Sequence, residues 1–89
     1  MTRPWEADAS ASFARRLGKS AQELGSSKDE DECPELWELD NGDVVVIGRD
    51  LTEAYASRLP AGVALAPDER LVVIPGIMLR SAKPDIADE

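Results

Sequence analysis

The sequence predicts an α+β fold in which an N-terminal helix precedes a small antiparallel sheet. Within residues 8–24, apolar residues recur at intervals of three and four, which is typical of an amphipathic helix. An Asn41-Gly42 pair lies between two short apolar runs, the strongest local signal for a β-hairpin. Val72–Ile74 repeats the β-branched character of Val45–Ile47. We therefore expect two ββα-like units that together form one four-stranded sheet.

The predicted N-terminal helix has one narrow apolar stripe. Its members are Phe13, Leu17, Ala21 and Leu24. Gly18 weakens such a helix by about 1 kcal/mol relative to alanine, and Gly25 is a suitable end. A helix of this length is marginal in water by itself. We expect it either to pack on the rest of the domain or to bind a partner.

Two strands are predicted on either side of Asn41-Gly42, at Glu35–Leu39 and Val44–Ile47. A two-residue type I′ turn would give both central residues a positive φ. This turn would place Leu39 opposite Val44, and Trp37 opposite Val46. Because both faces of this hairpin are largely apolar, we expect it to be covered at least in part on both sides.

The second half of the chain predicts a shorter helix and a second β unit. Asp50 and Glu53 have the spacing of a capping box, so a helix is expected to start there and to end before Pro60. Strands are expected at residues 63–66 and 70–74, with a turn at residues 67–69 between them. A closing helix is expected at residues 77–83.

With 89 residues the chain has room for one domain. We divide it into the N-terminal helix and acidic linker (residues 1–32), a compact β domain (33–84) and a disordered tail (85–89). A chain this short buries roughly 60% of the surface exposed by its unfolded state. It has only four aromatic residues, so pairing with a second copy or another chain would supply missing burial.

The net charge of −8 arises from one segment. Eight acidic residues and no basic residue lie between Asp29 and Asp43, while the other ten acidic residues equal the ten Lys and Arg in number. Such a block is repelled by a phosphate backbone, so nucleic acid is not the expected partner. It would be attracted to a basic protein surface, or it would act simply as a solvated linker.

The residues give no constellation for catalysis, and we expect neither a metal nor a cofactor. Histidine is absent, and the single Cys33 follows an acidic run that disfavours its thiolate. Asp29, Asp31 and Glu32 lack the spacing of a calcium loop. Glu38 shares a strand with apolar residues and is expected to pair with a base such as Arg49 or Arg70. The sequence therefore predicts a protein that is not an enzyme.

Location and source follow from composition. No apolar run approaches the roughly 20 residues of a membrane span, and the N-terminus does not resemble a signal peptide. We expect a cytoplasmic protein that does not bind membranes. Arginine outnumbers lysine seven to three in an alanine-rich chain, which favours a bacterial source with a GC-rich genome.

One resemblance covers about residues 33–83. The core Cys33-Pro34-x-Leu36-Trp37-Glu38-Leu39-x-Asn41-Gly42-Asp43, followed by residues 46–52 and 67–75, resembles short actinobacterial proteins of unknown function. These proteins are often encoded near helix-turn-helix regulators. The resemblance implies a regulatory or toxin–antitoxin-like accessory role and brings no catalytic residues with it.

A second resemblance gives the alternative function. Residues 70–80, from Arg70 through Pro75 to Arg80, are similar to a segment of swapped-hairpin transition-state regulators, which are DNA-binding dimers. That similarity implies phosphate contacts for Arg70 and Arg80. Both spacings are one residue too long, and the charge of the chain is opposite to that of a DNA-binding protein.

We therefore expect a non-enzymatic regulatory or accessory protein that binds a protein partner. The acidic block would steer it to a basic surface, and the helix stripe would enter a groove. The predicted partner-binding residues are Phe13, Leu17, Leu24, Asp29, Glu30, Asp31 and Glu32.

Overall fold

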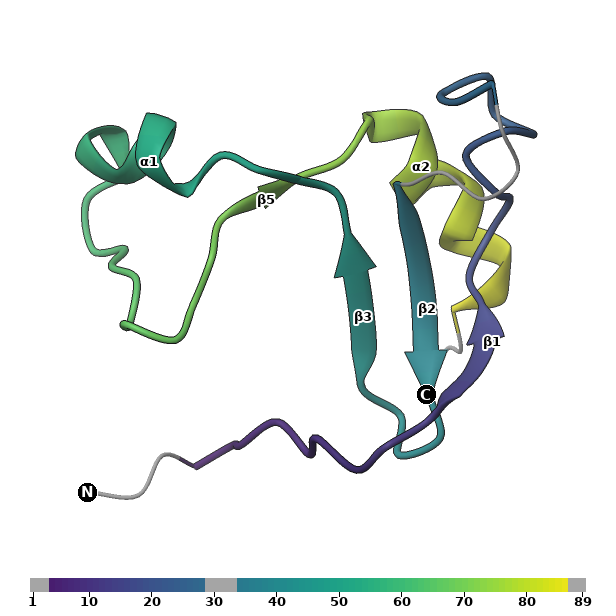
Figure 1. Cartoon of the computed structure of the whole chain (residues 1–89), viewed down its shortest axis with the longest axis horizontal. Helices are drawn as coiled ribbons and strands as arrows, with labels where there is room; N and C mark the ends of the chain where they lie inside the picture. Colours follow the sequence, from purple (N-terminus) through teal and green to yellow (C-terminus); the bar gives the residue numbers. More distant parts are fainter. Residues whose placement is uncertain (1–3, 29–33, 87–89) are drawn as a thin grey trace.

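The predicted hairpin forms the centre of the fold. The structure is a computed structural model that describes residues 4–28 and 34–86. In it β2 (Glu35–Leu39) and β3 (Val44–Ile47) pair antiparallel (Figure 1). The turn differs from the predicted one. The Gly42 N–H donates to the Leu39 carbonyl at 3.0 Å, the Leu39 N–H donates to the Asp43 carbonyl at 2.8 Å, and Gly42 has φ of 90°.

This hydrogen bonding indicates a three-residue loop, a type I turn followed by a glycine bulge, in place of the type I′ turn. Asn41 does not have a positive φ. The extra loop residue moves the register by one, so that Trp37 lies opposite Val45 and Leu36 lies opposite Val46. A one-residue shift changes which side chains share a face. The predicted faces were therefore wrong: Trp37 shares its face with Val45 and Ile47.

The predicted N-terminal helix is wrong. Phe13–Arg16 is a strand, β1, which pairs antiparallel with β2, with an irregularity between Phe13 and Arg15. The sheet order is β1-β2-β3. Two arginines of β1 lie opposite Glu38 and Trp37, and these long-range contacts outweigh the helical spacing. The predicted boundary at residue 32 therefore does not separate two structural units.

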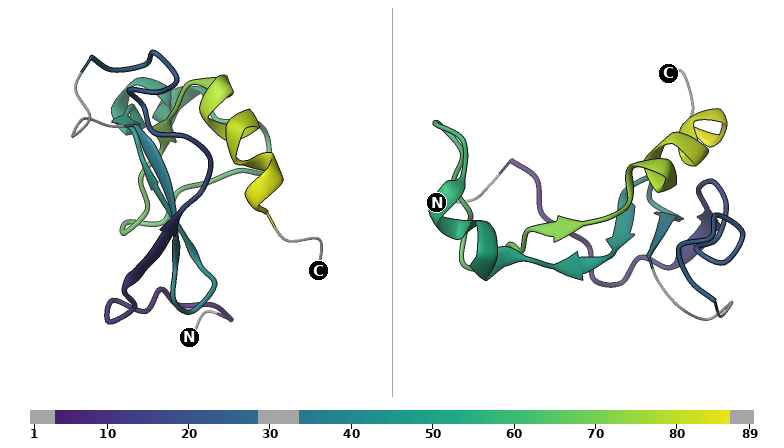
Figure 2. Two further views of the ribbon diagram at one scale, coloured as in Figure 1. Left: turned by 90° about the vertical axis from the view of Figure 1, so that its right-hand side faces the viewer. Right: turned by 90° about the horizontal axis from the view of Figure 1, so that it is seen from above.

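The core lies between this sheet and one helix. The helix α2 (Gly76–Ala82) continues into a 3₁₀ turn, η2 (Lys83–Asp85), and agrees with the predicted closing helix. It lies on one side of the three strands (Figure 2). Its Met78 and Ala82 pack with Leu17, Ala21 and Leu36 in a buried cluster, against which Leu24 and Ile74 also pack.

Gly18, which follows β1 and Leu17, lies in close contact with this helix. It has φ of +75°, a left-handed conformation that glycine adopts without steric cost. A Cβ there would lie 2.8 Å from the backbone nitrogen of Ala82. Its N–H donates to the Asp85 carboxylate at 2.7 Å. Asp85 is thus held by the fold, although it was predicted to begin a disordered tail; residues 87–89 lie outside the described residues.

The two predicted ββα units do not form one sheet. After β3 the chain makes β4 (Arg49–Asp50), α1 (Thr52–Tyr55) and the 3₁₀ turn η1 (Ala56–Arg58), then returns through β5 (Val72–Val73). β4 pairs only with β5, in a separate two-stranded ladder. The predicted helix after Asp50 and the turn at residues 67–69 are present, but residues 63–66 are not a strand.

The molecule is extended for its length. Residues 49–73, which we call the arm, project from the sheet on the side of β3 (Figure 1). The Cα radius of gyration is 14.6 Å, against about 12 Å for a compact chain of this length. The chain exposes 6967 Å², against about 5,100 Å² for a compact monomer of this mass.

Gly18→Ala should destabilise the protein more than Gly25→Ala. Both glycines have a left-handed φ, +75° and +76°, so each alanine incurs a backbone cost of roughly 1–2 kcal/mol. Only Gly18 faces α2, and overpacking there adds about 1–3 kcal/mol, whereas a Cβ on Gly25 meets nothing within 4 Å. Urea denaturation of both variants measures the difference. Equal losses would show that the Gly18 contact with α2 is not tight.

Candidate functional site

The arm begins where two strands cross closely. A Cβ on Gly48 would lie 2.5 Å from the Val73 carbonyl oxygen and 2.7 Å from Cγ2 of Ile74. A side chain at residue 48 would therefore push the outgoing and returning strands apart. Beside this crossing lies a cavity of about 310 Å³, lined by residues that include Pro34, Arg49 and Ile74. Gly48 thus fixes the place at which the arm leaves the sheet.

Hydrogen bonds, not burial, hold the arm together. The Leu51 N–H donates to the Leu71 carbonyl at 3.0 Å, and the Leu71 N–H donates to the Thr52 hydroxyl at 2.8 Å. None of residues 49–73 is buried. Large apolar side chains on the arm are exposed; these are Tyr55, Val63, Val72 and Val73. The arm therefore has no core of its own.

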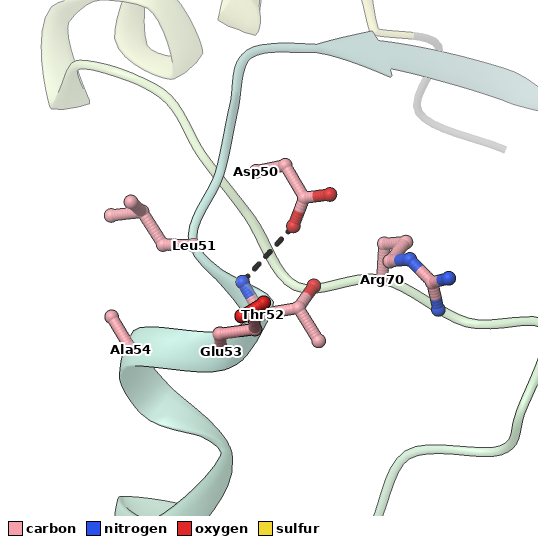
Figure 3. Close-up of a pocket in the computed structure, with 6 residues that line it drawn as sticks. All are labelled: Asp50, Leu51, Thr52, Glu53, Ala54 and Arg70. Atoms are coloured by element: carbon pink, nitrogen blue, oxygen red, sulfur yellow. Dashed lines mark hydrogen bonds between the residues drawn. The ribbon is translucent and has the colours of Figure 1, made fainter.

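One cavity lies at the start of α1 (Figure 3). It measures about 490 Å³ and is lined by Asp50, Leu51, Thr52, Glu53, Ala54 and Arg70. The Asp50 carboxylate accepts the Thr52 N–H at 3.0 Å. The helix cap was predicted at Asp50, but the N-cap is Leu51, and it has no side-chain cap bond. The hydroxyl of Thr52 and then its N–H lower the pKa of the Asp50 carboxyl.

The polar groups of this cavity bond to neighbouring residues of the arm. The hydrogen bonds from Thr52 favour the ionised form of Asp50, so its pKa moves away from the range of a general base at neutral pH. The Arg70 guanidinium lies apart from it (Figure 3) and donates to the Glu69 carbonyl at 2.9 Å. The polar groups thus organise the arm.

A second cluster lies on the face of the sheet that carries Trp37. Arg16 forms an ion pair with Glu35 at 3.0 Å, and the Trp37 indole N–H donates to the same carboxylate at 2.6 Å. The Arg16 guanidinium carbon lies 4.9 Å from the centroid of the Trp37 ring. Phe13 contacts Trp37 edge-on, with ring centroids 5.6 Å apart. Sequence reasoning missed this cluster because it treated Arg16 as part of a helix.

The predicted partner-binding residues do not form one surface. Leu17 is in the core, Leu24 packs against it, and Phe13 is exposed beside Trp37. The helix stripe that was expected to enter a groove is therefore absent. The other predicted residues, Asp29, Glu30, Asp31 and Glu32, lie outside the described residues, as does Cys33.

The acidic block is partly neutralised by the fold. Glu38 pairs with Arg15 at 2.8 Å; an ion pair was expected there, but with Arg49 or Arg70. Glu35 pairs with Arg16. Asp40 and Asp43 lie at the hairpin tip, where the Asp40 carboxylate accepts the Ser12 N–H at 3.1 Å. Strand β1 thus brings two bases to a segment that has none in sequence.

Arg70 and Arg80, the predicted phosphate contacts, belong to separate elements. Arg70 precedes β5 in the arm, whereas Arg80 lies on α2. The arm contains three arginines and four acidic residues, so it is not basic. No observation favours DNA binding over protein binding.

Across residues 4–28 and 34–86, no group of three or more Asp, Glu, His or Cys side chains could hold a metal ion. No helix in this part of the chain has both the length and the apolar character needed to span a membrane. No protein-family model matches the chain, and neither a curated protein nor a solved structure does.

Replacing Thr52 with valine should loosen the arm without affecting the core. The valine removes the acceptor of the Leu71 N–H, a bond worth about 1 kcal/mol. We expect amide exchange at Leu71 to speed up roughly five-fold to ten-fold, whereas Met78 in the core keeps its protection. Thr52→Ser, which retains the hydroxyl, is the matched control. NMR-detected hydrogen exchange measures these rates in the native protein and in both variants. An unchanged rate at Leu71 in Thr52→Val would contradict the role of the Thr52 hydroxyl in holding the arm.

Proposed function

We propose that this is a non-enzymatic regulatory or accessory protein that binds a protein partner through its arm. The observation that carries the proposal is that none of residues 49–73 is buried. The α1 helix has four residues and each strand of the ladder has two. Elements this short rarely keep one conformation without packing.

A partner would provide that packing. The exposed Tyr55 is half of a cation–π contact with Arg58, whose guanidinium carbon lies 4.5 Å from the ring centroid. Val63 lies beyond η1, in the part of the arm that leads back to β5. Aromatic and arginine side chains at the centre of an interface often contribute most of its binding energy. The Tyr55–Arg58 pair is therefore the proposed anchor.

The acidic segment supports a partner with a basic surface. Within the described residues Glu35 and Glu38 are already paired with arginines. We assign the steering to the acidic residues Asp29–Glu32 of the sequence and to the tip residues Asp40 and Asp43. Exposed charges of this kind mainly raise association rates and are screened by salt.

The arm can be tested by capture from the native host. We expect the tagged double variant Tyr55→Ser/Val63→Ser to recover its partner at least ten-fold less than the native protein, because two exposed apolar anchors are lost. Leu79→Ser is the control, since Leu79 is also an exposed apolar residue but lies on α2. Quantitative mass spectrometry of the captured proteins gives the ratio, and circular dichroism checks the fold. Full recovery by the arm variant would overturn the proposal.

The acidic segment makes a separate prediction about salt. Affinity for the captured partner should fall as ionic strength rises from about 0.05 to 0.5 M, because surface charges are screened. The variant Asp29→Asn/Glu30→Gln/Asp31→Asn/Glu32→Gln should bind more weakly at low salt and depend less on salt. Titration calorimetry at several salt concentrations measures both. A native affinity that is independent of salt would exclude the electrostatic part and leave the role of the arm in place.

A further inference from the structure

Residues 5–12, which we call the strap, connect two parts of the molecule that are far apart in the sequence. They precede β1, form neither a helix nor a strand, and none of them is buried. Figure 1 shows this segment running from β1, past the hairpin tip, toward the side of the molecule on which the arm lies. A segment near the end of a chain keeps one course only where specific contacts tie it down. The strap has such contacts at both of its ends.

At its C-terminal end the strap is anchored to the hairpin tip. The Ser12 N–H donates to the Asp40 carboxylate at 3.1 Å, and the Asp40 N–H donates to the Ser12 carbonyl at 2.9 Å. These two bonds lie directly beyond the Phe13–Leu39 pair of the sheet. Asp40 therefore holds the strap through both its main chain and its side chain.

A turn inside the strap defines its course. The Asp8 carboxylate accepts the Ser10 hydroxyl at 2.6 Å and the Ser10 N–H at 2.9 Å, and the Ala11 N–H donates to the Asp8 carbonyl at 3.1 Å. An aspartate that accepts the main-chain N–H two residues further on forms an Asx turn. The hydroxyl of Ser10 and then its N–H lower the pKa of the Asp8 carboxyl, so the acceptor of this turn stays charged at neutral pH.

At its other end the strap meets the arm. The two segments line one cavity of about 370 Å³, the strap with Trp5, Glu6 and Ala7 and the arm with Asp68 and Glu69. The arm residues belong to a turn that is closed by its own bonds. The Glu69 N–H donates to the Ala66 carbonyl at 2.9 Å, and the Ala66 N–H donates to the Glu69 carboxylate at 2.8 Å. The strap therefore meets a formed turn.

We propose that the strap ties the arm to the hairpin tip and fixes the direction in which the arm projects. Without it, the arm is joined to the sheet at the crossing beside Gly48, where each strand of the ladder has two residues. A ladder this short does not hold a projecting segment in one orientation by itself. A second attachment, at the turn of residues 66–69, removes that freedom. The order of the arm thus depends on Asp40, a residue of the hairpin tip.

The strap has a consequence for recognition, which rests on the function proposed above for the arm. A segment that is already held in its binding orientation loses less conformational entropy when it binds. Asp40 would then contribute to partner binding through the position of the arm as well as through its charge. The strap itself does not depend on that function, and its test needs no partner.

Spin-label distances test the strap on the full chain. The labels are placed at two exposed positions, Ala61→Cys in the arm and Lys83→Cys in η2, with Cys33→Ser to remove the native thiol. Double electron–electron resonance then reports the position of the arm relative to the core. The chain with its native strap should give one narrow distance distribution. Trp5→Ser should broaden it about two-fold, because the arm loses its second attachment and moves locally without unfolding.

Asp40→Ala tests the strap from its far end. It should also broaden the distribution, but by less, because the main-chain bond to Ser12 remains. The double variant should be no broader than Trp5→Ser alone, since both changes release the same strap. Asp43→Ala is the matched control: it removes the same charge from the same tip but no bond to Ser12. Hydrogen exchange at Met78 checks that the core is intact.

Three results would overturn the proposal. They are a broad distribution in the chain with its native strap, an unchanged distribution in Trp5→Ser or Asp40→Ala, and equal broadening by Asp43→Ala. None of them would bear on whether the arm binds a partner, because that is measured by capture with the Tyr55→Ser/Val63→Ser variant.

Discussion

The packing of Met78 and Ala82 against the sheet determines what the rest of the chain can do. α2 has seven residues, so it is about 10 Å long, and neighbouring strands lie about 4.8 Å apart. One helix of this length covers the junction of β1 and β2 and leaves β3 uncovered. Gly18 allows the chain after β1 to lie directly against α2, where a side chain would collide with Ala82. The buried cluster is small, and the exposed valines of β3 follow from its size.

The same constraint explains the arm. The arm is the connection between the end of β3 and the start of α2, and it has 25 residues between Gly48 and Ile74. Gly48 allows the two ends of the arm to cross in close contact. The helix α2 already packs on β1 and β2, and the arm leaves Val44 and Val46 of β3 exposed. Its order depends on the Asp50–Thr52 and Thr52–Leu71 hydrogen bonds, which makes it the part of the described chain with most to gain from a partner.

The sequence correctly predicted the helices and strands that depend on residues close to them in the chain. The hairpin was located by Asn41-Gly42, the arm helix by Asp50, and α2 by the residues that follow Pro75. The errors arose where a distant segment decides the outcome. The spacing of Phe13, Leu17 and Leu24 fits a helix, but Arg15 and Arg16 gain ion pairs with Glu38 and Glu35 only when the segment is a strand. The predicted hairpin register was also wrong by one residue, because an Asn-Gly pair is compatible with both a two-residue and a three-residue loop.

The candidate surfaces were hidden from the sequence for a related reason. Eight acidic residues without a base look like one negative surface, whereas β1 neutralises Glu35 and Glu38 through residues that lie about twenty positions away. Once these charges are paired, the described surface of the molecule is marked more by uncovered apolar strands than by acidity. Recognition by such a surface depends on burial and on strand pairing, which fix the geometry of a complex. The remaining charge, at the hairpin tip and in Asp29–Glu32, acts at longer range and contributes to the rate of encounter.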